Sequence, residues 1–215
     1  MTVWLDALEV GDDPSSWTAA GFHVAGHEVV VGSVRVRCLD DGEGHDRWRL
    51  RADDDADVPG SVDGIATSVV PAGVEGPTPA APEHPNRVVA FDHVVLRSPD
   101  VDRTTEALGG LGLDLRRTRV LGEGADAFQQ RFFRLGEVIL ELVGPAVPAG
   151  EGPCRIWGYA LVTEDIDASA AVLGDRCSPP KDAVQPGRRI ATVRTRDLGI
   201  GPTIALMTPH VRAGR

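Results

Sequence analysis

Two short segments decide the fold of this chain: FDHVVL at residues 91–96 and VILELV at residues 138–143. Both are rich in large apolar and β-branched residues, which favour β-strands. After the first segment, Ser98-Pro99-Asp100 predicts the start of a helix, because Ser and Asp cap helix N-termini. The glycine-rich stretch 109–112 marks the end of that helix.

The middle of the chain holds two more predicted strands, at residues 113–120 and 129–134. A tight turn at Leu135-Gly136 leads from the second of them into the closing segment. The middle block is therefore predicted to be a strand–helix–strand–strand–strand unit, or βαβββ module.

The same order recurs after residue 155. A strand at 157–162 precedes Glu164-Asp165-Ile166-Asp167, which opens a helix that ends near Gly174, and strands follow at 189–194 and 203–207. The first block is similar. It has a strand at 4–10, a helix start at Asp13-Pro14 that ends at Gly21, and a hairpin at 29–37.

Two breaks rich in Pro, Gly and Ala divide the chain, at 53–87 and at 144–153. The first contains one segment with strand propensity, at 64–70. We therefore predict a degenerate N-terminal βαβββ-like module at 1–52, a Pro/Gly-rich connector with one strand at 53–87, and paired βαβββ modules at 88–212.

The repeated unit, opened by FDHVVL and closed by VILELV, resembles the vicinal oxygen chelate superfamily, the group of glyoxalases, bleomycin-resistance proteins and extradiol dioxygenases. The likeness covers residues 88–209 and, more loosely, 4–39. It implies an α+β fold in which repeated βαβββ modules form a curved mixed sheet around a cup-shaped cavity, the glyoxalase-like fold.

The resemblance also implies where a metal would bind. The family places a His on the first strand and a Glu on the last strand of each unit, and His93 and Glu141 match this pair. Aligned with them, the second unit has Gly158 and Ala205, neither of which can bind a metal by its side chain. The resemblance thus implies an incomplete ligand set for a divalent metal ion, and no further cofactor is assigned. A third ligand would have to come from another subunit or from one of the remaining histidines, His23, His27, His45 and His210.

Strand parity places Glu141 on the cavity side of its strand. Val138, Leu140 and Leu142 share the face suited to packing under a helix, so Ile139 and Glu141 lie on the other. If Leu135-Gly136 is a two-residue turn, Phe132 opposes Ile139 and Gln130 opposes Glu141.

The last unit contributes a second wall to the predicted cavity. Met207 lies on its cavity side, together with Thr203 and Ala205. Arg189, in the pair Arg188-Arg189, can hold a substrate carboxylate by bidentate contact. The catalytic candidates are therefore Glu141 and His93, and the substrate-binding candidates are Gln130, Phe132, Ile139, Met207 and Arg189.

Simpler roles remain open for these residues. His93 can be a strand-end histidine bonded to backbone, Glu141 can form a structural ion pair, and the paired arginines can be solvated or salt-bridged. The tryptophans Trp17 and Trp157 are predicted to belong to the core.

Composition excludes several partners. Acidic residues outnumber basic ones by 32 to 22, which gives a formal net charge of −10 and argues against nucleic acid or an acidic membrane surface as a partner. No apolar run approaches the roughly 20 residues that span a bilayer, and the acidic N-terminal segment is unlike an export signal. The three cysteines form no C-x-x-C pair. We therefore expect a cytoplasmic protein with reduced thiols.

The function that follows from the resemblance is binding of a small oxygenated or carboxylated molecule in the cup. As an enzyme, the chain would be an isomerase, epimerase or lyase with Glu141 as the base, or a dioxygenase of the same superfamily. The alternative is a non-catalytic small-molecule binding or drug-sequestering protein with a degenerate metal site. A homodimer completed by the N-terminal module is left open.

Overall fold

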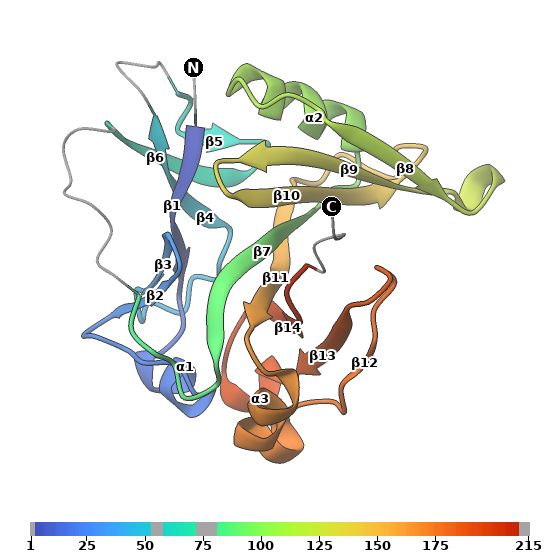
Figure 1. Cartoon of the computed structure of the whole chain (residues 1–215). Helices are drawn as coiled ribbons and strands as arrows, with labels where there is room; N and C mark the ends of the chain where they lie inside the picture. The colour runs from blue at the N-terminus through green and yellow to red at the C-terminus, as the bar shows by residue number, and fades with distance from the viewer. Residues whose placement is uncertain (1–2, 53–57, 72–80, 211–215) are drawn as a thin grey trace, which may run out of the picture. The chain divides into compact units, whose positions relative to one another are not determined.

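The computed structural model describes residues 3–52, 58–71 and 81–210 (Figure 1). Within them the chain is built mainly from strands with few helices, and the sheets mix parallel and antiparallel pairs, which confirms the predicted α+β class. Contacts divide the chain into two compact units, one of residues 1–9, 45–78 and 93–157, the other of residues 10–44, 79–92 and 158–215. The cup-shaped cavity stays a prediction.

The first unit contains a sheet with the strand order β1-β4-β6-β5. Its strands are β1 (Val3–Val10), β4 (Arg47–Ala52), β5 (Ser61–Val62) and β6 (Ile65–Pro71). Trp48 and Leu50 fill its core, and the Trp48 indole donates a hydrogen bond of 2.7 Å to the Thr67 hydroxyl. The strand β6 occupies the part of the connector in which we expected one.

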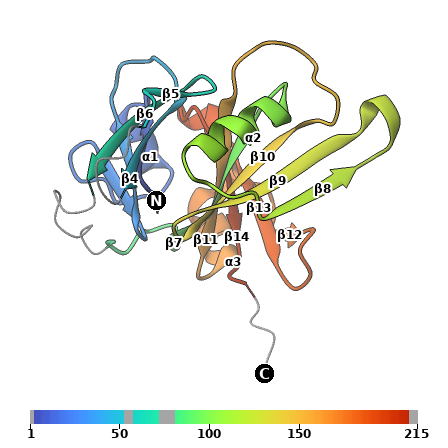
Figure 2. The same cartoon turned by 90° about the horizontal axis from the view of Figure 1, so that it is seen from above.

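The second sheet of this unit follows the predicted order of strand, helix and three strands. It consists of β7 (Val88–Arg97), α2 (Val101–Gly110), β8 (Arg117–Leu121), β9 (Phe128–Leu135) and β10 (Val138–Pro145), with a 3₁₀ turn at Gly124–Asp126. β10 is parallel to β7 and antiparallel to β9, which is antiparallel to β8. α2 lies across one face of these strands (Figure 2). We call this the helix face and the opposite one the far face.

Capping fixes the start of α2. The Asp100 carboxylate accepts hydrogen bonds from the backbone N–H groups of Asp102 and Arg103, at 3.1 and 3.0 Å. The buried hydroxyl of Thr104 lies 2.7 Å from that of Ser98, which closes the first turn. The two bonds to Asp100 satisfy N–H groups that a helix start otherwise leaves without partners.

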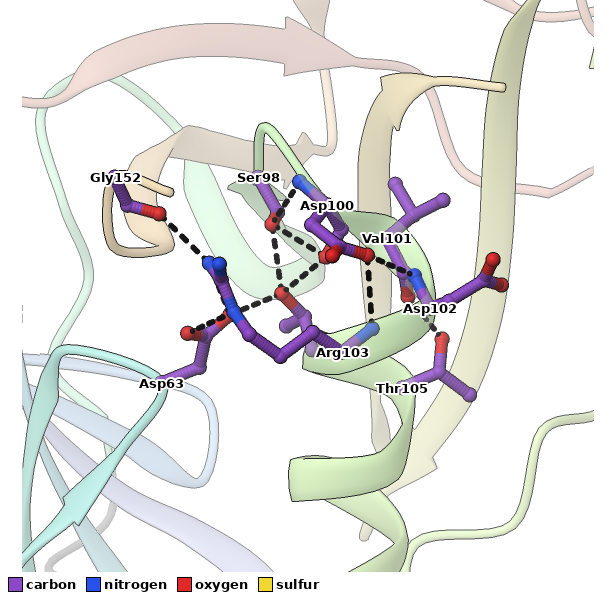
Figure 3. A network of polar contacts seen from close by, with 9 residues as sticks. Asp63, Ser98, Asp100, Val101, Asp102, Arg103, Thr105 and Gly152 are labelled. Carbon is purple, nitrogen blue, oxygen red and sulfur yellow. Dashed lines mark hydrogen bonds and ion pairs between the residues drawn. The ribbon is translucent and has the colours of Figure 1, made fainter. Parts of the chain in front are cut away.

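A second contact ties α2 to the β5–β6 turn (Figure 3). The Asp63 carboxylate, in that turn, accepts a hydrogen bond from Thr104 Oγ1. It also forms an ion pair with Arg103, whose Nε lies 2.8 Å from Asp63 Oδ1. Arg103 also donates to the Gly152 carbonyl at 2.7 Å. Gly64 next to it has φ +98°, and a Cβ there would lie 2.3 Å from Pro153 Cβ, so glycine is required. The connector strand pair is thereby anchored to the helix of the middle module.

The second unit contains α1 (Pro14–Ala19) and the antiparallel hairpin of β2 (Glu28–Val31) and β3 (Val34–Cys38). It also holds most of the last module, in the strand order β12-β13-β14-β11. The elements of that module are β11 (Arg155–Thr163), α3 (Ile166–Leu173), β12 (Lys181–Asp182), β13 (Arg189–Val193) and β14 (Thr203–Met207), with 3₁₀ turns at Gly174–Arg176 and Thr195–Leu198. Ile204 and Leu206 are buried on the face that carries α3.

α3 begins as α2 does. Asp165 accepts hydrogen bonds from the N–H groups of Asp167 and Ala168, at 3.1 and 3.0 Å. The buried Ser169 hydroxyl lies 2.6 Å from that of Thr163 and donates to the Asn86 carbonyl at 2.7 Å. The repeat therefore extends to the hydrogen bonds of the helix starts.

Three expectations need correction. β9 pairs Leu135 with Val138, so the turn is Gly136-Glu137 rather than Leu135-Gly136, and Gly136 takes the positive φ of +66°. The second strand of the middle module starts at Arg117 and not at residue 113. Trp17 is buried as expected, but the Trp157 side chain is 50% exposed. Trp157 lies two residues before Tyr159, where the buried part of that face of β11 begins.

The compact units do not follow the linear division at 52 and 87, since β1, β7 and β11 each run from one unit into the other. That division follows module order and stays a prediction. Parts of the predicted segments, residues 1–2, 53–57, 72–80 and 211–212, lie outside the described residues.

All three cysteines are buried free thiols. Burial raises the pKa of Cys38 and of Cys154 to about 12, with nearby carboxylates contributing, and it also raises the pKa of Cys177. Thiols with such pKa values are unreactive at neutral pH, because the thiolate is the nucleophile.

Candidate acid–base site

Three polar side chains meet on the far face of β7, β10 and β9. Gln130 Nε2 donates a hydrogen bond of 2.8 Å to Glu141 Oε1, and His93 Nε2 lies 3.4 Å from Glu141 Oε2. Each carboxylate oxygen of Glu141 thus has its own partner. The structure therefore brings together the two predicted catalytic residues and one of the predicted substrate-binding residues.

These side chains are neither fully buried nor freely solvated. The side chains of His93 and Glu141 are 16% and 13% exposed. Gln130 Oε1 is buried and has no hydrogen-bond partner within the part of the chain that the structure describes. A buried acceptor without a partner costs about 1–3 kcal/mol, which a donor on a bound ligand would offset.

The strand register explains how Gln130 reaches Glu141. Directly across from Glu141 lies Phe132, and across from Gln130 lies Val143, so Gln130 and Glu141 are diagonal neighbours. The predicted pairing was wrong by two residues, since it put Gln130 opposite Glu141 and Phe132 opposite Ile139. An even shift leaves every side chain on its expected face.

Two half-buried apolar side chains flank the polar group. Phe132 lies across from Glu141 on β9, and Ile139 pairs with His93 between β10 and β7. Both share the far face with the acid–base residues, because directly paired residues point to the same side of a sheet. They place apolar surface beside the Glu141 carboxylate.

The last module has the same register without the polar residues. His93 pairs with Ile139, two residues before Glu141, and Gly158 pairs with Thr203, two residues before Ala205. Gly158 and Ala205 therefore occupy the positions of His93 and Glu141. A Cβ at Gly158 would lie 2.3 Å from the Thr203 carbonyl oxygen, so the backbone of β14 leaves no room for a side chain there.

The donor set at this site does not fit the metal that the resemblance implies. Only His93 and Glu141 offer metal-binding atoms at the matching positions, and no group of three or more His, Cys, Asp or Glu side chains suited to a metal occurs among the described residues. Catalytic zinc sites use three protein ligands, and iron that activates oxygen uses two His and one carboxylate. No step is therefore assigned to a metal here.

Met207 and Arg189 belong to the second unit. Met207 is buried on the face of β14 opposite α3, which we also call the far face of the last module, with Thr203 and Ala205 on the same side. Arg189 shares a side of β13 with the buried Ala191, toward α3, and makes two hydrogen bonds to Asp167, at 2.6 and 3.0 Å. These bonds lower the pKa of the Asp167 carboxyl. The structure gives Arg189 a salt-bridge partner on α3, which does not support its predicted substrate contact.

The neighbouring Arg188 was not predicted as a partner of any residue. Its guanidinium donates to Asp92 at 2.8 Å, with side-chain exposures of 1% for Arg188 and 3% for Asp92. It also donates to the Thr208 carbonyl and lies 3.2 Å from His210 Nε2. No sequence signal links Asp92 with Arg188, because they are far apart in the chain and only folding places them together.

No helix among the described residues is both long enough and apolar enough to cross a bilayer. No family model matches the sequence, and no curated protein matches it.

Solved structures do match. A triple mutant of 4-hydroxymandelate synthase from Streptomyces coelicolor is 14% identical with a TM-score of 0.64, over 99% of this chain and 94% of that one. A catechol 2,3-dioxygenase is 14% identical with a TM-score of 0.60, over 100% of this chain and 92% of that one. At such identities the likeness concerns the fold. By its βαβββ modules and by these neighbours, the chain has the glyoxalase-like fold of the vicinal oxygen chelate superfamily.

Proposed function

We propose that the far face of β7, β10 and β9 is an acid–base site that acts on a small oxygenated or carboxylated molecule. The observation that carries this proposal is the contact of Glu141 with both His93 and Gln130 on a half-buried, partly apolar surface. A carboxylate held by defined partners near a substrate C–H group is suited to remove a proton.

The reaction follows from the groups present. Glu141 takes a proton from a carbon next to a carbonyl or carboxyl group, and the C–H electron pair moves onto that oxygen to form an enolate. The proton then returns to carbon, from Glu141 or from a protonated His93, which gives an isomerase or epimerase. Gln130 is a positioning residue, because its amide holds Glu141 Oε1 and directs the other oxygen toward His93.

The test requires no knowledge of the natural substrate. The purified chain is incubated in D₂O with 2-oxo acids and 1,3-dicarbonyl acids, and exchange of the acidic C–H is followed by NMR. Glu141→Gln should slow catalysed exchange by roughly 10²–10⁴, the usual contribution of a general base. Glu137→Gln, in the β9–β10 turn, is the matched control and should leave exchange unchanged.

Two outcomes would remove the base assignment: unchanged exchange in Glu141→Gln, or no exchange by the wild-type chain with any probe. Exchange is also measured on chelator-treated protein and after addition of Zn²⁺, Mn²⁺ or Fe²⁺. Because His93 and Glu141 alone are too few ligands for a catalytic metal, the proposal expects exchange without any of these ions. Exchange that appears only with a metal would show that a further ligand completes the site.

A second candidate function is non-catalytic binding of a small molecule. The observation in its favour is Gly158, where the approach of β14 removes the position that would carry the second metal-binding His. Binding of a probe to wild-type protein without catalysed exchange would favour this candidate.

A further inference from the structure

Four arginines lie on the same far face as the acid–base site. Arg134 pairs with Ile139 and donates a hydrogen bond of 3.1 Å to the Glu137 carbonyl, and the other three are Arg97, Arg117 and Arg119. Arg119 on β8 pairs with Gln130 on β9, which pairs with Val143 on β10, which pairs with Arg97 on β7. In the next row, Arg117 pairs with Phe132, which pairs with Glu141. Because directly paired residues point to one side, Arg97, Arg117 and Arg119 share the face of Gln130 and Glu141.

The rows also give the spacing. Neighbouring strands are about 4.8 Å apart, so the Cα atoms of Arg117 and Glu141 are separated by about 10 Å across β9. Arg119 is one strand away from Gln130, and Arg97 lies one strand away from Val143 on the other side. Side chains as long as arginine can therefore reach a ligand that touches Glu141.

The side chains of these three arginines are exposed and make no hydrogen bond or ion pair with the described part of the chain. Nearby arginines differ. Arg131, on the helix face of β9, is bonded to Asp102 and Thr105 of α2, and Arg116 lies 3.8 Å from Asp114. Acidic residues outnumber basic ones in the whole chain, with a net charge of −10, so there is no general excess of cations to explain the cluster.

We infer that Arg97, Arg117 and Arg119 form a subsite for an oxyanionic group, a carboxylate or a phosphate, of the molecule on which Glu141 acts. This inference rests on the proposed function for the reacting end of that molecule. Guanidinium groups bind carboxylate and phosphate oxygens by paired N–H donors, and three unpaired like charges on one face are stabilised by an anion. The substrate class is thereby narrowed to small anions whose acidic C–H lies several ångströms from the charged group.

The probes are malonate for a carboxylate, phenyl phosphate for a phosphate and malonamide as the uncharged analogue of malonate. Binding is measured by NMR titration of wild-type protein, of Arg117→Gln, of Arg119→Gln and of the double variant. Arg116→Gln is the matched control. It removes the same charge from the adjacent residue, which precedes β8 and whose guanidinium lies 3.8 Å from Asp114 Oδ2.

Wild-type protein should bind malonate or phenyl phosphate and not malonamide, and the tighter of the two anions identifies the group. The double variant should bind that anion at least about tenfold more weakly, and Arg116→Gln should stay within about twofold. Absence of saturable anion binding by the wild type, or equal losses in Arg116→Gln and Arg119→Gln, would overturn the inference.

The same titration separates this inference from the proposed function. Glu141→Gln should keep its affinity for the anion while it loses catalysed exchange. If the wild type binds the anion through Arg117 and Arg119 but catalyses no exchange, the proposed chemistry fails and the oxyanion subsite remains. If exchange depends on Glu141 but the double variant binds the anion normally, the subsite fails and the chemistry remains.

Discussion

The middle module, β7 to β10, and the last module, β11 to β14, share a backbone frame but differ in their far faces. Both helices start with an Asp cap and a buried pair of hydroxyls, Ser98 with Thr104 and Thr163 with Ser169. On the far face, His93 and Glu141 of one module correspond to Gly158 and Ala205 of the other. The comparison teaches that the groups that hold the frame are repeated, whereas the proposed acid–base residues are not.

The two helices also differ in what lies beyond their caps. Thr104 donates to the Asp63 side chain, which is further held by Arg103, whereas Ser169 donates to the backbone carbonyl of Asn86. The side-chain carboxylate of Asp63 and the backbone carbonyl of Asn86 thus accept the hydrogen bond of the equivalent helix hydroxyl in the two modules. The module with the proposed acid–base site is the one whose helix is anchored by a carboxylate, that of Asp63.

The largest expected effect on stability comes from Arg188, which the sequence did not predict as a site residue. Arg188→Met removes the buried guanidinium that pairs with the Asp92 carboxylate and should lower the free energy of unfolding by about 3–5 kcal/mol. Arg189→Met, next in the chain, removes only an exposed pair and should cost less than about 1 kcal/mol. Urea unfolding followed by circular dichroism measures both. Similar losses in the two variants would contradict this distinction.

The next test asks whether the last module is closed to a second histidine. Gly158→Ala places a Cβ against the Thr203 carbonyl and should lower the free energy of unfolding by about 1–3 kcal/mol. Gly109→Ala on α2 is the matched control, because its Cβ would meet nothing within 4 Å and the helix should gain about 0.5–1 kcal/mol. If Gly158→Ala leaves the free energy of unfolding unchanged, the backbone of β14 does not exclude a side chain at this position. The two modules would then differ here only in the residue type, and not in the space available.

The smallest effects should be equal in the two modules. Asp100→Ala and Asp165→Ala each remove the acceptor of two helix N–H groups and should each cost about 1 kcal/mol. The difference between their unfolding midpoints is the measurement. If one substitution lowers the free energy of unfolding several times more than the other, the two caps have the same geometry but do not contribute equally to stability.

Much of this frame was accessible from the sequence. FDHVVL and VILELV, the Asp caps and the glycine-rich helix exits are local signals, and they located the two modules and the face of Glu141. The turn error at Leu135-Gly136 was also avoidable. Gly at the first central position is typical of a two-residue type II′ turn, which is the arrangement in Gly136-Glu137.

Other features had no local signal. The contact of Asp63 with α2 and that of Asp92 with Arg188 join segments far apart in the chain. The alignment of Arg97 with Arg119 needs the register of four strands at once. The sequence predicts Trp157 in the core, yet the burial of β11 on that side starts only at Tyr159. Such features depend on tertiary pairing rather than on residue pattern.

The three buried cysteines have a practical consequence. Since each thiol is shielded and the pKa of two of them is raised to about 12, a maleimide dye should leave the native chain unlabelled at neutral pH. Thr118→Cys, exposed on β8 between Arg117 and Arg119, would then provide a single attachment point for a fluorophore. A change in the intensity of its emission would then report which molecule in a metabolite mixture binds beside these arginines.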